Sequence, residues 1–145
     1  MWHRDIHDNN SSLRLYKSFK SEYVLEPYLS CINIDRHRQA LSKFRCSSHF
    51  LEIERARHQN RIPPIWERNC LFCPYAVDDE LHLLLYCSKN RELRVQFLNI
   101  VFDYHPEIAE MHHLEQFESI MASQNHVILQ ALGKYIFESF KIRNI

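Results

Sequence analysis

The 145-residue chain contains a single glycine, Gly133, and this composition excludes several function classes. Phosphate cradles and dinucleotide-binding loops need several glycines, and all-β folds use glycine in hairpin turns. The formal net charge is zero, no run of about 18 apolar residues occurs, and the amino end lacks the apolar core of a signal peptide. We therefore expect one mainly α-helical domain over residues 1–145 that is intracellular, nuclear or cytoplasmic, and binds no membrane.

The neutral net charge conceals an uneven distribution of charged residues along the chain. Residues 34–68 hold eight Lys and Arg against four Asp and Glu, whereas residues 100–125 hold five acidic residues and no Lys or Arg. A basic segment of this kind permits contact with an anionic partner. It does not prove such contact, because a solvated charged surface has the same composition.

Helical segments are expected before the cysteine-rich stretch. The stretches LRLYKSFK and VLEPYL, within the first 30 residues, are predicted to form short helical turns around Tyr16, Phe19 and Leu25. An amphipathic helix follows, with Asn33 as its cap and an apolar face formed by Ile34, His37, Leu41 and Phe44. His37 on this face is interpreted as a core residue rather than as a catalytic base.

The next segment, HFLEIERARHQN, ends before the prolines at 63 and 64. The residues expected to face a core are Phe50, Ile53 and Ala56. Basic residues flank both segments, and those predicted to bind nucleic acid are Arg36, Arg38, Lys43, Arg45, Arg55, Arg57, Arg61 and Arg68. Aromatic residues of the same region that are candidates for stacking on bases are Phe44, Phe50 and Trp66.

Four potential metal ligands follow with the spacing Cys70-x2-Cys73-x8-His82-x4-Cys87. Three thiolates and one imidazole are typical of a closed structural zinc site, and a two-residue gap lets two sulfurs converge on one ion. Protein atoms would fill all four positions and leave no place for a catalytic water. The predicted cofactor is therefore one structural Zn²⁺ ion.

Other interpretations of this stretch are buried structural thiols, a redox pair and a polymerase acid pair. A redox pair needs a βαβ setting and a helix N-terminus that lowers a thiol pKa, and neither is visible in the sequence. Asp78 and Asp79 precede a helix-like segment, where negative side chains stabilise a helix start by roughly 0.3–1 kcal/mol. We interpret them in this way rather than as magnesium ligands. Cys31 and Cys46 lack partners at ligand spacing and are interpreted as buried thiols.

Three helices are predicted beyond the cluster. The first has Ser88 as its cap, ends before the proline at 106, and has an apolar face of Leu93, Phe97, Ile100, Val101 and Tyr104. A weaker helix is predicted over residues 114–121, with Phe117 and Ile120 facing the core. The last begins after Asn125, and its inner side is formed by Ile128, Leu132, Tyr135, Ile136 and Phe140. Gly133 inside this helix costs about 1 kcal/mol relative to alanine, so close packing is expected there.

Together these motifs resemble the C-terminal zinc-binding region of non-LTR, LINE-type retrotransposon reverse transcriptases. The stretches that carry the likeness are HRQALSKFRCSSHFLEIERAR, RIPPIWERNC, DDELH and LLLYC, with a weaker likeness in LGKYIFESFK. The resemblance covers about residues 13–102 and implies that the metal ligands are Cys70, Cys73, His82 and Cys87. It also implies that the module lies downstream of a polymerase domain and helps to hold template RNA or target DNA. The chain departs from the family in lacking polymerase and endonuclease segments, and in having Pro74-Tyr75 after the second cysteine.

The sequence thus predicts a non-catalytic zinc-binding module that binds RNA or DNA non-specifically. A reverse transcriptase polymerase domain is a further candidate partner. It would comprise a basic helical part (13–69), a zinc knuckle (70–87) and C-terminal helices (88–145). The alternative is a zinc-stabilised structural or protein-interaction module, which packing of the basic 34–68 segment on the acidic 100–125 segment would favour. An enzyme ranks last and no small-molecule substrate is expected, because His112 and His113, adjacent on a helix, point about 100° apart and lack further ligands.

Overall fold

A computed structural model describes residue 16 and residues 24–145 of the chain. Within these residues the regular secondary structure is helical, apart from one isolated antiparallel bridge between Asn69 and Val77. The prediction of a mainly α-helical domain is confirmed. The turn expected around Phe19 lies outside the described residues, and Leu25 is exposed just before the first described helix.

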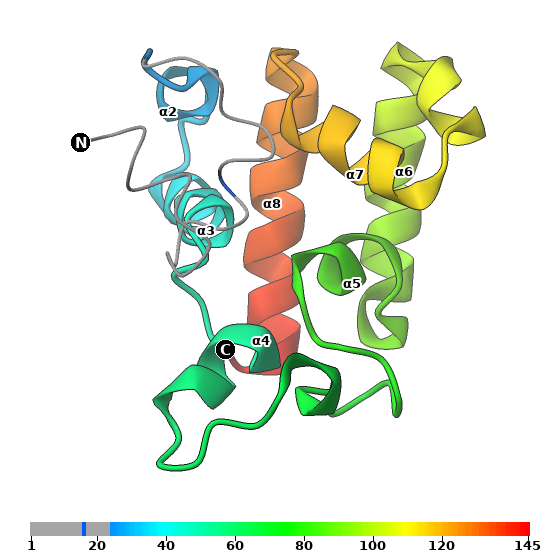
Figure 1. Ribbon diagram of the computed structural model, residues 1–145. Coiled ribbons are helices and arrows are strands. Elements are labelled where there is room, and N and C mark those ends of the chain that lie inside the picture. Colours follow the sequence, from blue (N-terminus) through cyan, green and yellow to red (C-terminus); the bar gives the residue numbers. More distant parts are fainter. Residues whose placement is uncertain (1–15, 17–23) are drawn as a thin grey trace.

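The C-terminal helix α8 (His126–Arg143) stands at the centre of the fold (Figure 1). Helices α2 (Pro27–Cys31) and α3 (Asp35–Arg45) pack against one side of α8. The contact is formed by the apolar face of α3, on which Leu41 and Phe44 are fully buried. The apolar faces of α3 and α8 meet in this interface and bury the part of the core that the N-terminal helices contribute.

Three features of α3 differ from the sequence prediction. Ile34 rather than Asn33 occupies the cap position, and no side chain caps the helix. Ile34, predicted to lie on the apolar face, is 48% exposed. Phe44 is completely buried in the core, so its predicted stacking on bases is wrong. His37 is buried as predicted, and burial lowers its pKa, which favours the neutral imidazole.

Helix α8 starts and packs as its sequence indicates. The side chain of Asn125 accepts hydrogen bonds from two amides of the first turn, at 2.9 and 3.1 Å. Gly133 lies where α8 crosses α3, and a Cβ atom added there would meet Cδ1 of Ile32 at 3.0 Å and the carbonyl oxygen of His37 at 3.2 Å. The close packing expected at Gly133 is confirmed.

The other side of α8 is covered by α5 (Glu80–Leu85), which carries part of the cysteine cluster, and by the helices that follow the cluster (Figure 1). The helices that follow are η4 (Ser88–Asn90), α6 (Arg91–Tyr104), η5 (Pro106–Glu110) and α7 (His113–Met121). The ring of Phe97 stacks on that of Tyr135 with centroids 5.2 Å apart, which joins α6 to α8. Asn90 rather than Ser88 holds the cap position of α6. Tyr104, predicted to be inward, is half exposed.

The segment between α3 and the cysteine cluster crosses the lower end of the molecule in Figure 1. It contains α4 (Glu52–Arg55), η2 (Ala56–His58) and η3 (Ile65–Glu67). Ile53 and Ala56 are buried as predicted, but Phe50 is 64% exposed, so its assignment to the core is wrong. Its neighbours at 49 and 51 are buried instead, and adjacent side chains of an extended segment point to opposite sides.

Candidate metal centre

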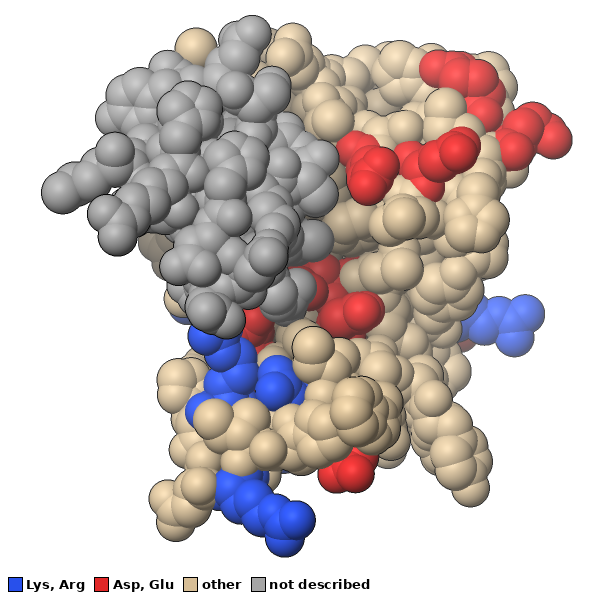
Figure 2. Space-filling model, in the orientation of Figure 1, with Lys and Arg blue, Asp and Glu red and all other residues tan. Residues whose placement is uncertain are grey.

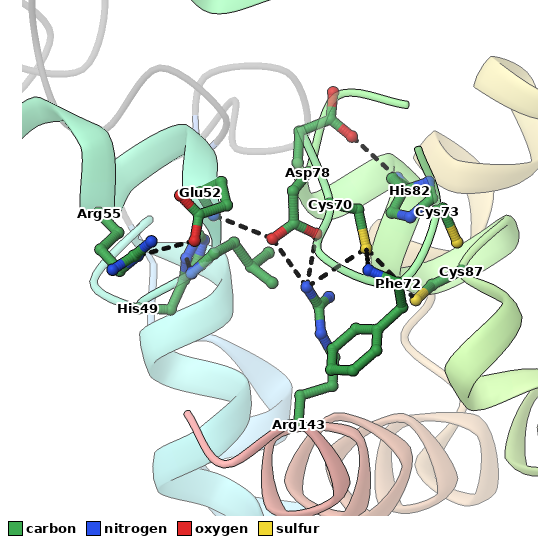
Figure 3. Close-up of polar contacts among 12 residues, drawn as sticks. His49, Glu52, Arg55, Cys70, Phe72, Cys73, Asp78, His82, Cys87 and Arg143 are labelled. Carbon is green, nitrogen blue, oxygen red and sulfur yellow. Dashed lines mark hydrogen bonds and ion pairs between the residues drawn. The ribbon is translucent and has the colours of Figure 1, made fainter. Parts of the chain in front are cut away.

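The four predicted metal ligands are brought together by one loop and one short helix. Cys70 and Cys73 lie in the loop that the isolated bridge closes, His82 lies in α5, and Cys87 follows that helix. Their ligand atoms all lie within 4.8 Å of one another (Figure 3). The predicted Cys3His cluster is therefore present in the fold and could form a metal site.

The spacing of one donor pair fits a tetrahedral ion. Bonds of about 2.3 Å from zinc to sulfur place two tetrahedral ligands roughly 3.7 Å apart. The sulfurs of Cys70 and Cys87 are 3.9 Å apart. Nε2 of His82 is buried and lacks a hydrogen-bond partner among the described residues, and such an orphaned buried nitrogen needs an explanation. Coordination of an ion by this imidazole would supply it.

Local hydrogen bonds shape the loop that carries the first two ligands. The amide of Cys70 donates to the carbonyl of Ala76 at 2.8 Å, and the amide of Ala76 donates to the carbonyl of Cys73 at 3.2 Å. The turn between them forces Tyr75 into the left-handed region, with φ of 71°, and leaves its side chain 97% exposed. The loop thus closes around Pro74-Tyr75 at the cost of local backbone strain.

Asp79 fixes the start of the helix that carries His82. Its Oδ1 accepts a hydrogen bond from the amide of His82 at 2.8 Å and so caps α5. The interpretation of Asp79 as a helix N-terminal residue is confirmed. The cap also fixes the first turn of α5, and with it the direction of the imidazole.

Burial and hydrogen bonding set the protonation of the ligands. Burial raises the pKa of the Cys70 thiol to about 12, and it lowers the pKa of His82, which favours the neutral imidazole that binds metals. Burial opposes ionisation of Cys73, but hydrogen bonds with the hydroxyl and amide of Ser88 outweigh it and lower the pKa of this thiol. An ion bound here would displace the proton of Cys70, so metal affinity should fall as the pH is lowered.

A buried ion pair lies directly beside the cluster, and sequence reasoning missed it. Nη2 of Arg143 contacts both carboxylate oxygens of Asp78, at 2.8 and 2.7 Å, and the sulfur of Cys70 at 3.7 Å (Figure 3). The same carboxylate accepts a hydrogen bond from the amide of Glu52 at 3.0 Å. Asp78 thereby connects the metal loop to α4 and to the last turn of α8.

A second buried polar group supports the connection between α3 and α4. The carboxylate of Glu80 contacts Nε2 of His49 at 2.8 Å and the hydroxyl of Ser47 at 3.0 Å. All three residues are buried. Because Glu80 begins α5, this contact attaches the segment around Phe50 to the helix that holds His82.

Three of the predicted nucleic-acid-binding residues are engaged inside the fold. Arg45 is 3% exposed, donates to the carbonyl of Met121 at 2.8 Å and pairs with Glu26 at 3.3 Å. Arg68 donates to the carbonyls at 63 and 53, and Arg38 to that at 32. These guanidinium groups join segments of the backbone, and Arg45 is too deeply buried to reach a phosphate.

The remaining predicted residues lie at the surface. Arg55 and Arg57 form ion pairs within their own turn, with Glu52 at 2.7 Å and with Glu54 at 2.9 Å. The other three are exposed and form no ion pair with any residue that the structure describes. They are Arg36, Lys43 and Arg61.

Basic and acidic side chains gather at different ends of the visible face. Figure 2 shows most blue side chains at the lower left and red ones at the upper right and the centre, with a further blue group at the right and a red one near the bottom. Between described residues, no ion pair joins the basic 34–68 segment to the acidic 100–125 segment. The two segments do touch inside the fold, because the buried guanidinium of Arg45 donates to the carbonyl of Met121 at 2.8 Å.

Residues outside the cluster form no second metal site in the described part of the chain. His112 and His113 are exposed, and His113 contacts the hydroxyl of Tyr86. Cys31 is buried, as predicted, whereas Cys46 is only half-buried. The candidate metal chemistry is therefore concentrated at the Cys3His cluster.

Comparisons of the chain with protein-family models, with curated proteins and with solved structures find no match. The likeness to reverse transcriptase zinc-binding regions stays a prediction from the quoted motifs. None of the helices among residues 24–145 combines the length and the apolar character needed to cross a bilayer.

Proposed function

We propose that this chain is a non-catalytic zinc-binding module that binds RNA or DNA through its basic end. The observation that carries the proposal is the position of Arg36, Lys43 and Arg61. These cations are exposed, form no ion pair with described residues, and belong to a segment that holds eight Lys and Arg against four Asp and Glu. A surface cation without a carboxylate partner is free to contact a phosphate group, and phosphate contacts dominate the affinity for nucleic acids.

Zinc is the ion that the ligand set favours. Three thiolates and an imidazole suit zinc, whereas magnesium and calcium prefer oxygen ligands. Four protein ligands would complete the coordination shell, so the ion would have a structural role. It would hold the loop around Cys70 and Cys73 against the end of α5, next to the buried pair of Asp78 and Arg143.

The surface charges explain how a chain of zero net charge can bind a polyanion. Long-range attraction depends on the local field, and a basic patch generates such a field even where distant acidic residues cancel the total charge. The proposed partner is RNA or DNA in the nucleus or cytoplasm. If the resemblance to retrotransposon reverse transcriptases reflects descent, a polymerase domain of that class is a further partner.

A structural or protein-interaction module is the second candidate, and exposed apolar side chains near the metal loop favour it. Leu71, Trp66 and Tyr75 are each at least 74% exposed. An apolar surface of this kind is also typical of protein interfaces. Under this alternative the basic residues would be a solvated surface and nucleic acid would not bind.

A salt titration with charge-neutralised variants tests the proposal. The double variant Lys43→Gln and Arg61→Gln should weaken binding of single-stranded RNA, measured by fluorescence anisotropy. It should also reduce the slope of log K against log salt by about 0.7 for each lost phosphate contact. Arg91→Gln with Lys134→Gln removes the same charge from exposed positions on α6 and α8 and serves as the matched control. Affinity that is independent of salt, or an equal loss in the control, would contradict the proposal.

A further inference from the structure

Phe50 is an exposed aromatic residue on a rigid segment. Its side chain is 64% exposed, although both of its neighbours, His49 and Leu51, are buried. His49 is held by the Glu80 carboxylate at 2.8 Å, and the amide of Leu51 donates to Nδ1 of His49 at 3.3 Å. The backbone on each side of Phe50 is therefore held in place, and the Phe50 ring is exposed to solvent.

Two grooves meet at this ring. The first, of about 500 Å³, is lined by Phe50 together with Lys43, Ser48, Arg57 and His58. The second, of about 510 Å³, is lined by Phe50 together with Arg55, Leu71, Phe72 and Arg143. Both volumes are within the usual range of sites for small ligands, about 300–1,000 Å³. Phe50 lines both grooves.

The two grooves differ in chemical character. In the first, Glu54 is paired with Arg57, so Lys43 is the cation in excess. In the second, Glu52 is paired with Arg55 and Asp78 with Arg143, so the side-chain charges balance. Leu71 is an exposed apolar wall of this groove, whereas the ring of Phe72 is covered by the cations of Arg143 and Lys89. One groove thus suits an anion, and the other suits a flat, uncharged group.

An anionic group beside a flat aromatic group is the chemistry of a nucleotide. Single-stranded nucleic acids bind through cations that contact the backbone and aromatic rings that stack on bases. A duplex does not offer this arrangement, because its bases are stacked on one another inside the helix. The charge and the shape of the two grooves therefore favour a single strand.

We propose that Phe50 stacks on an unpaired base of RNA or DNA. The phosphate would lie in the first groove at Lys43, and the neighbouring base would lie in the second groove against Leu71. The inference rests on the proposed nucleic-acid binding and assigns it to single strands. It also gives the metal loop a direct role, because Leu71 lies between the ligands Cys70 and Cys73.

The test measures binding of a single-stranded RNA of about 12 nucleotides that carries one 2-aminopurine, whose fluorescence is quenched by stacking. The zinc-loaded chain should bind and quench this base. Phe50→Ala should weaken binding about 5- to 100-fold and abolish the quenching, with an unchanged salt slope because no phosphate contact is lost. Phe50→Leu should behave like Phe50→Ala, since an aliphatic side chain cannot stack. Tyr104→Ala, which removes a half-exposed ring on α6, should have no effect.

Thermal melting should show the same transition for Phe50→Ala and the unmodified chain, since the exposed ring contributes little to the core. Three outcomes would overturn the stacking inference and leave the proposed function in place. They are normal RNA affinity of Phe50→Ala, normal RNA affinity of Phe50→Leu, and an equal loss of affinity of Phe50→Ala for duplex and for single-stranded RNA. If the unmodified chain binds no nucleic acid, both the inference and the proposed function are wrong.

Discussion

Asp78 and Asp79 are adjacent in the sequence, yet their carboxylates have different roles in the fold. Asp79 caps α5 through a local hydrogen bond to the amide of His82. Asp78 is 1% exposed and forms an ion pair with Arg143, 65 positions away. The two residues therefore stabilise the same corner of the molecule by different amounts.

Substitution of these two residues should separate the contributions. Asp78→Ala leaves the guanidinium of Arg143 buried without its partner, which should lower the free energy of unfolding by about 3–5 kcal/mol. Asp79→Ala removes a helix cap, for which the expected loss is about 1 kcal/mol. Urea unfolding of both variants in the presence of zinc measures the difference. An equal or larger loss for Asp79→Ala would contradict the role assigned to Asp78.

The residue scale also shows which parts of the site a sequence can predict. The four ligands follow from their spacing, and Asp79 follows from its position before a helix, because both signals are local. The pair of Asp78 and Arg143 depends on where α8 ends relative to the metal loop. No periodicity or spacing within either segment contains that information.

At the scale of elements, the contact between α3 and α8 depends on Gly133. A Cβ atom at this position would lie 3.0 Å from a buried isoleucine side chain and 3.2 Å from a backbone oxygen of α3. The isoleucine contact is with the end of a side chain, whereas the oxygen can move only with the backbone of α3. Glycine therefore allows the two helices to approach at the cost of helix propensity.

Replacement of Gly133 should reveal this balance. Gly133→Ala gains about 1 kcal/mol of helix propensity, but overpacking of a dense interface costs about 1–3 kcal/mol. We expect a net decrease in the free energy of unfolding, and a larger decrease for Gly133→Val, both measured by thermal or urea unfolding. An increase in stability for Gly133→Ala would show that the interface relaxes and that the close contact is not essential.

Helix boundaries and buried residues are predicted more accurately for long segments with apolar periodicity than for short ones. In α8 all five residues predicted to face inward are buried, and α7 spans His113–Met121, close to the predicted 114–121. The segment around Phe50 is different, because α4 has only four residues. There, the contact between His49 and Glu80 decides which side chain is buried, and a residue from another helix supplies it. Arg45 is a similar case, since its buried hydrogen bond reaches the carbonyl of Met121.

At the scale of the whole molecule, the metal cluster lies where three parts of the chain meet. The loop from 69 to 77, helix α5 and the last turn of α8 contact one another around Cys70 and Arg143 (Figure 3). An ion bound only by the folded chain lowers the free energy of the folded state. We therefore expect zinc to stabilise the contact between the segment around Phe50 and the helices around α8. Removal of the ion should weaken both the fold and the proposed binding surface.

The zinc content of the purified chain tests the central claim most directly. Elemental analysis should find one zinc ion per chain, and Cys73→Ser should lose the ion and melt at a lower temperature. Cys46→Ser, at a half-buried cysteine outside the cluster, should keep the ion. An unmodified chain that contains no metal after preparation with zinc, or a Cys73→Ser variant that binds zinc as tightly as the unmodified chain, would contradict the account.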